Sequence, residues 1–291
     1  MIPEHLVSEL RYIELRTAQR IRNLRAGAYT SRLRGDGFDF DQHRLYRAGD
    51  DVRRIDWNVT ARLGVPFLRQ TYAERELDVV IAVDLSRSMN FVSSRRSKQE
   101  ALTLVTASLL FSAAADQIKT GFLAFTDRVV SWTPPTANKG RAWTTLGQLW
   151  DLKVKSSRTA LLPAVSHLIR SLKRMTLVVV VSDFMSDEDL NASREFGMLA
   201  SRHDVVAVVL GDKAESRLPS GSGYVRVRDL ESGGELTLRL NNQVRARYAE
   251  TAHRRRDELT RYCYRVGIDP VFVDTDEDVV EPLLALFERR R

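Results

Sequence analysis

The sequence predicts an α/β fold in which helices cover both faces of a mainly parallel β-sheet. Three nearly continuous apolar runs, Val79–Val83, Leu177–Val181 and Val205–Leu210, are typical of strands buried on both faces of such a sheet. Segments with helical periodicity lie between these runs, as right-handed crossover connections require. Ligands bind such sheets outside the carboxyl ends of the strands, so the residues that follow the strands are the first candidates for function.

Two regions are expected from the order of the elements. Residues 1–76 form an N-terminal extension, with a helix over 5–26 followed by short strands, one of them over Val65–Tyr72. Residues 77–291 form the α/β domain. Its expected elements are strand Val79–Val83, helix Ser97–Asp116, strands Gly121–Phe125 and Val129–Trp132, helices Lys139–Leu149 and Leu161–Lys173, strand Leu177–Val181, helix Asp187–Arg202, strand Val205–Leu210, a hairpin over Tyr224–Leu240, helix Gln243–Val266, strand Pro270–Val273 and a last helix to the terminus.

Composition and cysteine content indicate a soluble globular protein of the cytoplasm. Hydrophobic residues make up 43% and charged residues 29% of the 291 positions, which are ordinary values. The apolar runs are much shorter than the roughly 20 residues that a membrane span needs. The N-terminus lacks the basic start and apolar stretch of a signal peptide. The single cysteine, Cys263, excludes an internal disulfide and any cysteine-based zinc site.

The net charge of +7 comes mainly from arginine. In the N-terminal third the arginines alternate with Asp and Glu, which favours ion pairs over the one-signed stripe that binds a phosphate backbone. We therefore expect no nucleic-acid partner. Only Arg254–Arg256 and Arg289–Arg291 are concentrated, and each fits a solvated helix face or tail, with an acidic partner, an anionic membrane surface or RNA as alternatives.

Three loops bring oxygen donors to one edge of the predicted sheet. Asp84, Ser86 and Ser88 follow the first buried strand, Asp183 follows the second, and Thr159 lies in a loop before a helix. Carboxylates and hydroxyls are hard donors that suit Mg²⁺ best here, with Mn²⁺ and Ca²⁺ as alternatives. Two carboxylates do not saturate such a cation, so an open position could take an acidic residue of a partner protein. The alternative is that Asp84 and the serines only cap the following helix.

The set Asp84-x-Ser86-x-Ser88, Thr159 and Asp183 resembles the metal-ion-dependent adhesion site of von Willebrand factor A domains. The resemblance covers roughly residues 77–275 and implies a von Willebrand factor A-like, Rossmann-like fold for them. Arg87 stands where many such domains carry glycine.

The N-terminal third is similar to the signature of the "domain of unknown function 58" family. The matching segments are Ser31–Phe40, Tyr46–Trp57 and Glu74–Glu76. The resemblance implies a bacterial or archaeal adaptor that works with a MoxR-type AAA+ ATPase in assembly or maturation of other complexes. It also implies association with membrane-anchored proteins that carry von Willebrand A domains, and through them with the inner membrane. Physically, the mixed charges of the signature predict either an ion-pair network that fixes the extension or a partner-binding surface.

No enzymatic motif accompanies these residues. The sequence has no Gly-rich loop ending in Lys-Ser or Lys-Thr, no His-Glu-x-x-His and no Gly-x-Ser-x-Gly. The leading hypothesis is therefore a metal-dependent binding module with no catalytic residues. A hydrolase that uses the same cation to activate water, and a basic nucleic-acid-binding protein, are the alternatives.

Overall fold

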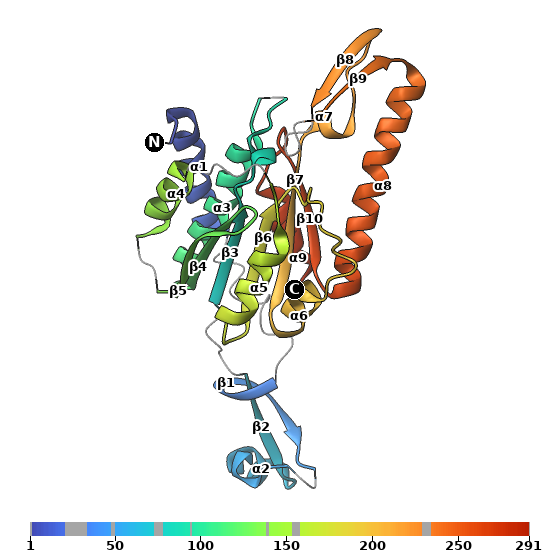
Figure 1. Cartoon of the computed structure of the whole chain (residues 1–291). Helices are drawn as coiled ribbons and strands as arrows, with labels where there is room; N and C mark the ends of the chain where they lie inside the picture. The colour runs from blue at the N-terminus through green and yellow to red at the C-terminus, as the bar shows by residue number, and fades with distance from the viewer. Residues whose placement is uncertain are drawn as a thin grey trace.

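A computed structural model describes residues 2–20, 34–47, 50–72, 78–93, 95–137, 140–152, 158–228 and 234–290 (Figure 1). Its helices are α1 (Glu4–Arg20), α2 (Trp57–Leu63), α3 (Lys98–Ala115), α4 (Ala142–Asp151), α5 (Leu161–Ser171), α6 (Glu195–Arg202), α7 (Lys213–Ser216), α8 (Asn242–Val266) and α9 (Glu281–Arg289), with short 3-10 helices η2 (Val52–Arg54) and η3 (Arg87–Asn90). Its strands are β1 (Arg34–Leu45), β2 (Phe67–Tyr72), β3 (Asp78–Asp84), β4 (Lys119–Phe125), β5 (Val129–Thr136), β6 (Thr176–Ser182), β7 (Asp204–Gly211), β8 (Gly223–Arg228), β9 (Glu235–Leu240) and β10 (Asp269–Asp274).

The central sheet has six strands in the order β10-β7-β6-β3-β4-β5. The first five are parallel, and β5 pairs antiparallel with β4 at one edge. Strands β3 and β6 are therefore neighbours in the middle of the sheet although β4 and β5 come between them in the chain. Their carboxyl ends carry Asp84 and Ser182, so the loops after them meet at one edge.

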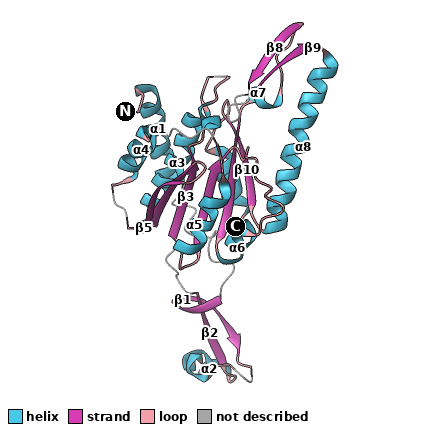
Figure 2. Ribbon diagram, in the orientation of Figure 1, coloured by secondary structure: helices cyan, strands magenta, loops and turns pink. Residues whose placement is uncertain are grey.

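Helices cover both faces of this sheet, which confirms the predicted fold class (Figure 2). Alternate residues of β3 point to opposite faces, as the two-residue period of a strand requires. Ile81 and Val83 pack with α1, α3, α4 and α9, whereas Val80 and Ala82 pack with α5, α6 and α8. All four side chains are fully buried, which explains the continuous apolar run of this strand.

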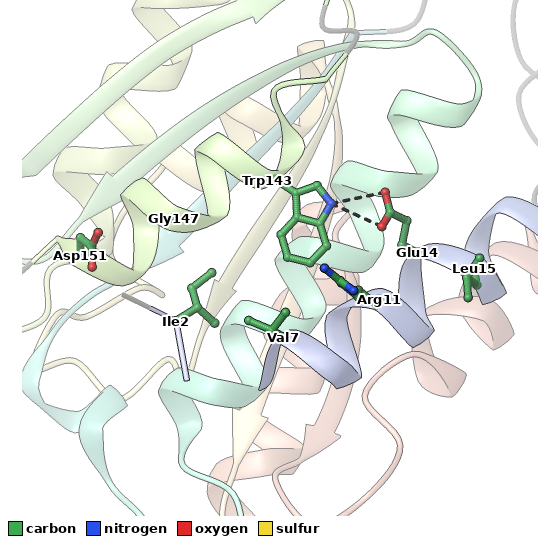
Figure 3. Close-up of a pocket in the computed structure, with 8 residues that line it drawn as sticks. All are labelled: Ile2, Val7, Arg11, Glu14, Leu15, Trp143, Gly147 and Asp151. Carbon is green, nitrogen blue, oxygen red and sulfur yellow. Dashed lines mark hydrogen bonds between the residues drawn. The ribbon is translucent and has the colours of Figure 1, made fainter. Parts of the chain in front are cut away.

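Helix α1 is packed into the core of the α/β unit. Its residues Leu6, Leu10 and Ile13 recur at helical spacing, are buried, and belong to the same apolar cluster as the sheet residues beneath α3. A cavity of about 840 Å³ between α1 and α4 is lined in part by Val7, Arg11 and Gly147 (Figure 3). There Trp143 Nε1 donates to both carboxylate oxygens of Glu14 at 3.4 and 3.3 Å. The predicted domain boundary at residue 76 stays a prediction. Helix α1 precedes this boundary, yet it packs in the core of the α/β domain that follows it.

The rest of the N-terminal region forms a small unit of β1, β2 and α2, which Figure 1 shows apart from the central sheet. Arg44 donates two hydrogen bonds of 2.7 Å to Asp50, which lowers the pKa of this carboxyl to about 2. Asp56 caps α2 through the N–H groups of Asn58 and Val59 and contacts His43 at 2.9 Å. Among the described residues, the signature thus makes local ion pairs and caps. Ser31–Leu33 and Glu74–Glu76 lie outside them.

One expected helix starts later than expected, and the end of another lies outside the described residues. The helix expected over 187–202 begins only at Glu195, because the preceding polar residues use their side chains locally. Asp189 accepts hydrogen bonds from the N–H groups of Asn191 and Ala192, and Glu188 caps another helix. The helix expected over 5–26 is described as far as Arg20, and its expected end at Gly27 lies outside the described residues.

The C-terminal half adds a hairpin of β8 and β9, which projects beyond one end of the sheet, and the long helix α8, which runs from the hairpin back along the sheet (Figure 1). One arginine of each basic cluster makes a contact within the fold. The Arg256 guanidinium lies 4.0 Å from the centre of the Phe272 ring. Arg290 pairs with Asp204 at 2.9 Å and with Asp269. In the described part of the chain, no helix is long and apolar enough to cross a membrane.

Candidate metal centre

Asp84 is the last residue of β3 and is completely buried. Its Oδ1 accepts a hydrogen bond of 2.8 Å from the backbone N–H of Ser86, and its Oδ2 accepts one of 2.6 Å from the Ser182 hydroxyl. These bonds turn the chain immediately after the strand and fix the carboxylate between β3 and β6. Ser182 was not among the predicted site residues, although it directly precedes Asp183.

The hydroxyls of Ser86 and Ser88 converge beside Asp84. Both side chains are buried, and their Oγ atoms are 3.1 Å apart. The two hydroxyls are hydrogen-bonded to each other. Adjacent oxygen ligands of an octahedral Mg²⁺ are about 3.0 Å apart when the metal–oxygen distances are about 2.1 Å, so the same spacing is compatible with two ligands of one cation. The helix that follows directly is η3. Ser86 is at its N-cap position but makes no side-chain capping hydrogen bond, while Asp84 accepts the Ser86 N–H.

Asp183 follows β6 and is buried next to Ser182. Its Oδ1 accepts a hydrogen bond of 3.0 Å from the backbone N–H of Met185. The intervening residue, Phe184, has a positive φ of 54°, a left-handed conformation that a bulky side chain rarely adopts. Its N–H donates to the Ser182 hydroxyl at 3.0 Å, which helps to hold this turn. Backbone strain of this kind is concentrated at functional sites.

Thr159 reaches the same edge of the sheet through the neighbouring strand. Phe125, at the end of β4, is the register partner of Asp84, and the next residue, Thr126, accepts a 2.9 Å hydrogen bond from Ala160 N–H. Thr159 itself is buried. From the other side, Glu188 accepts hydrogen bonds from the first N–H groups of α5, at Leu161 and Leu162. The Thr159 loop is thus attached both to β4 and to the loop that follows Asp183.

The electrostatics of this edge favour a cation. Burial and the nearby negative charge of Asp183 raise the pKa of Asp84 to about 7, despite the hydrogen bonds from Ser182 and Ser86 that oppose the shift. A nearby positive charge would stabilise two buried carboxylates that interact in this way. The predicted donors are of the kind that a small divalent cation prefers, and the 3.1 Å between the Ser86 and Ser88 hydroxyls is compatible with two adjacent ligands. Asp84, Ser86, Ser88, Thr159 and Asp183 would hold it.

Lys98 is a component of this site that sequence reasoning missed. It is the first residue of α3, its side chain is fully buried, and its Nζ lies 2.9 Å from Asp183 Oδ2. It also bonds to Glu215 on α7. Burial lowers the pKa of Lys98, but Asp183 and Glu215 together more than offset this, so the pKa is raised and the side chain stays charged. No local pattern reveals a pair whose members are 85 positions apart.

A groove with a volume of about 1150 Å³ opens beside the site. Ser88 and Glu215 line it near the strand ends, the loop from Phe184 to Asn191 lines another part, and β8, β9 and α8 supply the rest. The hairpin has one apolar face, because Val225 and Val227 lie opposite Leu238 and Leu236 on β9. This arrangement can seat a segment of another chain next to the predicted cation.

The chain belongs to the DUF58 family, described as a protein of unknown function, whose profile matches residues 42–258. An uncharacterized protein of Mycobacterium tuberculosis, Rv1480, is 28% identical over 288 residues, which are 98% of this chain and 90% of that protein. A shorter one of Mycobacterium avium, MAV169, is 28% identical over 134 residues, covering 46% of this chain and 78% of that protein.

The chain is also similar to two solved structures. BatB of Bacteroides thetaiotaomicron, described as a conserved hypothetical protein, is 19% identical with a TM-score of 0.48 and covers 74% of this chain and 98% of that chain. A von Willebrand factor type A protein of Catenulispora acidiphila is 12% identical with a TM-score of 0.44 and covers 77% of this chain and 43% of that chain.

Proposed function

We propose that this protein is a metal-dependent protein-binding adaptor and not an enzyme. Its partner is a MoxR-type AAA+ ATPase, and its role is in assembly or maturation of other protein complexes. The observation that carries the proposal is the convergence of Asp84, Ser86 and Ser88 beside Asp183, with the two serine hydroxyls 3.1 Å apart. The partner and the role come from the resemblance to the DUF58 family and to adhesion-site domains.

The proposed mechanism follows from the charges. The two carboxylates hold a divalent cation and balance its charge, while the hydroxyls complete only part of its coordination shell. A carboxylate of the partner takes the remaining position, so binding requires both the cation and an acidic residue. Such a site needs no general base, and the adaptor works in the cytoplasm, reaching the inner membrane only through membrane-anchored partners.

The first test is metal binding by purified protein. Asp84→Asn removes one negative charge at nearly constant size, so we expect it to abolish Mn²⁺ binding measured by electron paramagnetic resonance. Asp187→Asn is the matched control, because Asp187 is an exposed acid in the loop after Asp183, and this variant should bind like wild type. Equal Mn²⁺ binding by all three proteins would refute the metal site.

The second test measures partner binding. Tagged wild type, Asp84→Asn and Asp257→Asn are mixed with the purified MoxR-type ATPase of the same organism, in Mg²⁺ and in EDTA. Asp257 is the control here because it is an exposed acid of α8 that does not line the groove. We expect recovery of the ATPase only with wild type and Asp257→Asn, and only in Mg²⁺. Recovery in EDTA would keep the adaptor role but remove the metal bridge. Mg²⁺-dependent hydrolysis of a phosphoester panel that Asp84→Asn abolishes would favour the hydrolase instead.

A further inference from the structure

The Lys98 ammonium lies in a closed polar cluster between two carboxylates from distant parts of the chain. Its Nζ is 2.9 Å from Asp183 Oδ2 and is also hydrogen-bonded to Glu215 Oε1, and its side chain is fully buried. Lysine is almost never fully buried unless it is paired. A buried ion pair contributes little net stability compared with apolar packing, whereas removing one partner is strongly destabilising. The presence of this cation next to a predicted metal ligand therefore needs an explanation other than stability.

We propose that Lys98 is a positioning residue that serves as a built-in counter-ion of the metal centre: it holds Asp183 in place without the metal and limits how tightly the metal binds. The inference rests on the proposed function, since it concerns the same site. It goes beyond that function by assigning a role to a side chain that would not itself contact the cation.

The charge balance gives the direction of the effect. Asp84, Asp183 and Glu215 supply up to three negative charges within one buried cluster, and Lys98 cancels one of them. A divalent cation at Asp84 and Asp183 would lie near the fixed ammonium and be repelled by it. Because this repulsion acts in a region of low effective dielectric, it is larger than the same pair would feel in water. Lys98 therefore weakens metal binding and keeps it reversible.

Contacts of Glu215 extend this cluster towards the groove. Glu215 closes the capping box of α7, where it accepts the Asp212 N–H at 3.1 Å. The neighbouring Ala214 carbonyl accepts a 3.1 Å hydrogen bond from Tyr248 of α8. Ala214, Glu215 and Tyr248 all line the groove beside the site. Lys98 thus joins the metal ligand Asp183 to the wall against which a partner would bind.

The test compares Mn²⁺ affinity and thermal stability of the full chain in wild type, Lys98→Met and Lys213→Met. Methionine keeps the unbranched shape of the side chain, one atom shorter, without its charge. Lys213 is the matched control, because its side chain is 54% exposed and pairs with Asp276. We expect Lys98→Met to bind Mn²⁺ about tenfold more tightly or better, as removal of a nearby like charge requires. Its Tm without metal should fall and recover on adding Mn²⁺, whereas Lys213→Met should match wild type.

A second variant covers the case in which Lys98→Met does not fold without metal. Glu215→Gln keeps Lys98 paired with Asp183 but removes one carboxylate from the cluster, so Mn²⁺ binding should weaken. Affinity equal to or below wild type in folded Lys98→Met, or unchanged affinity in Glu215→Gln, would overturn the inference while leaving the metal site intact. A wild type that binds no Mn²⁺, together with a Lys98→Met that binds none, would instead defeat the proposed function. Binding by Lys98→Met alone would support the inference.

Discussion

At the scale of single residues, two charged groups in the interior of this protein are stabilised by specific hydrogen-bond or ion-pair partners. Asp84 is stabilised by Ser182 and Ser86, and Lys98 by Asp183 and Glu215. Each of these groups lies at the carboxyl edge of the sheet. Cys263 on α8 is different, because it is buried at 1% exposure in the apolar cluster against the sheet. Its burial, helped by the charge of Asp269, raises the pKa of the thiol to about 12.

Cys263 is therefore expected to resist alkylation in the native protein. The thiolate is the reactive form, and at pH 8 a thiol with a pKa near 12 is almost entirely protonated. Iodoacetamide should label Cys263 rapidly in guanidinium, where the pKa returns to its ordinary value, and very slowly in native buffer. Mass spectrometry follows one site only, since the chain has a single cysteine. Equal labelling rates in the two conditions would contradict the buried placement of α8.

At the scale of elements, the start of α3 is the point on which the site depends. The Ser97 hydroxyl accepts the Glu100 N–H at 3.2 Å, and Glu100 accepts the Ser97 N–H at 2.7 Å. This capping box fixes the residue after it, Lys98, as the first of the helix. The helix is also apolar on nearly all sides, because α1 covers the face that would otherwise meet solvent. This local motif thus fixes the backbone position from which the Lys98 side chain reaches Asp183.

Ser97→Ala should destabilise the protein by about 1 kcal/mol, the usual cost of losing an N-cap hydroxyl. Urea unfolding followed by circular dichroism measures the change. Ser201→Ala is the control, because Ser201 is an exposed residue of α6 whose hydroxyl bonds only to the Met198 carbonyl; such surface changes stay within about 0.5 kcal/mol. An effect of Ser97→Ala no larger than that of the control would show that the cap is not needed to start α3.

At the scale of the whole molecule, the question is which parts fold together. Helix α1 lies outside the predicted boundary of the α/β domain, yet its apolar face completes the layer formed by α3, α4 and α9. The β1–β2–α2 unit follows in the chain and has its own pairings and caps. The N-terminal region is therefore not uniform: its first helix packs in the main core, whereas the described signature residues after it belong to a separate small unit.

Leu10→Ala tests the packing of α1. Leu10 is fully buried, so truncation should cost about 2–5 kcal/mol and should lower the stability of the whole sheet domain. Leu15→Ala in the same helix is the control, because Leu15 is 68% exposed. Thermal unfolding of the two variants measures the difference. Similar Tm values for Leu10→Ala and wild type would mean that α1 is not part of the cooperative core.

The sequence by itself determined the buried strands and the loops that carry Asp84, Ser86, Ser88, Thr159 and Asp183. These features depend on local periodicity and on the rule that parallel strands end at one edge. The starts of short helices were less predictable, since Asp189 and Glu188 could either begin α6 or bond elsewhere.

Only the tertiary structure decided that Lys98 would meet Asp183 and Glu215, that Ser182 would bond to Asp84, and that α1 would cover α3. The contacts of Lys98 and of Ser182 join residues that are 85 or more positions apart. The contact of α1 with α3 depends on how two layers pack. Sequence periodicity specifies which face of an element is buried, but not which distant side chain lies opposite it. The packing of the sheet and its two helical layers determines which side chains meet. Buried charged groups are stable there only when this packing places a partner beside them.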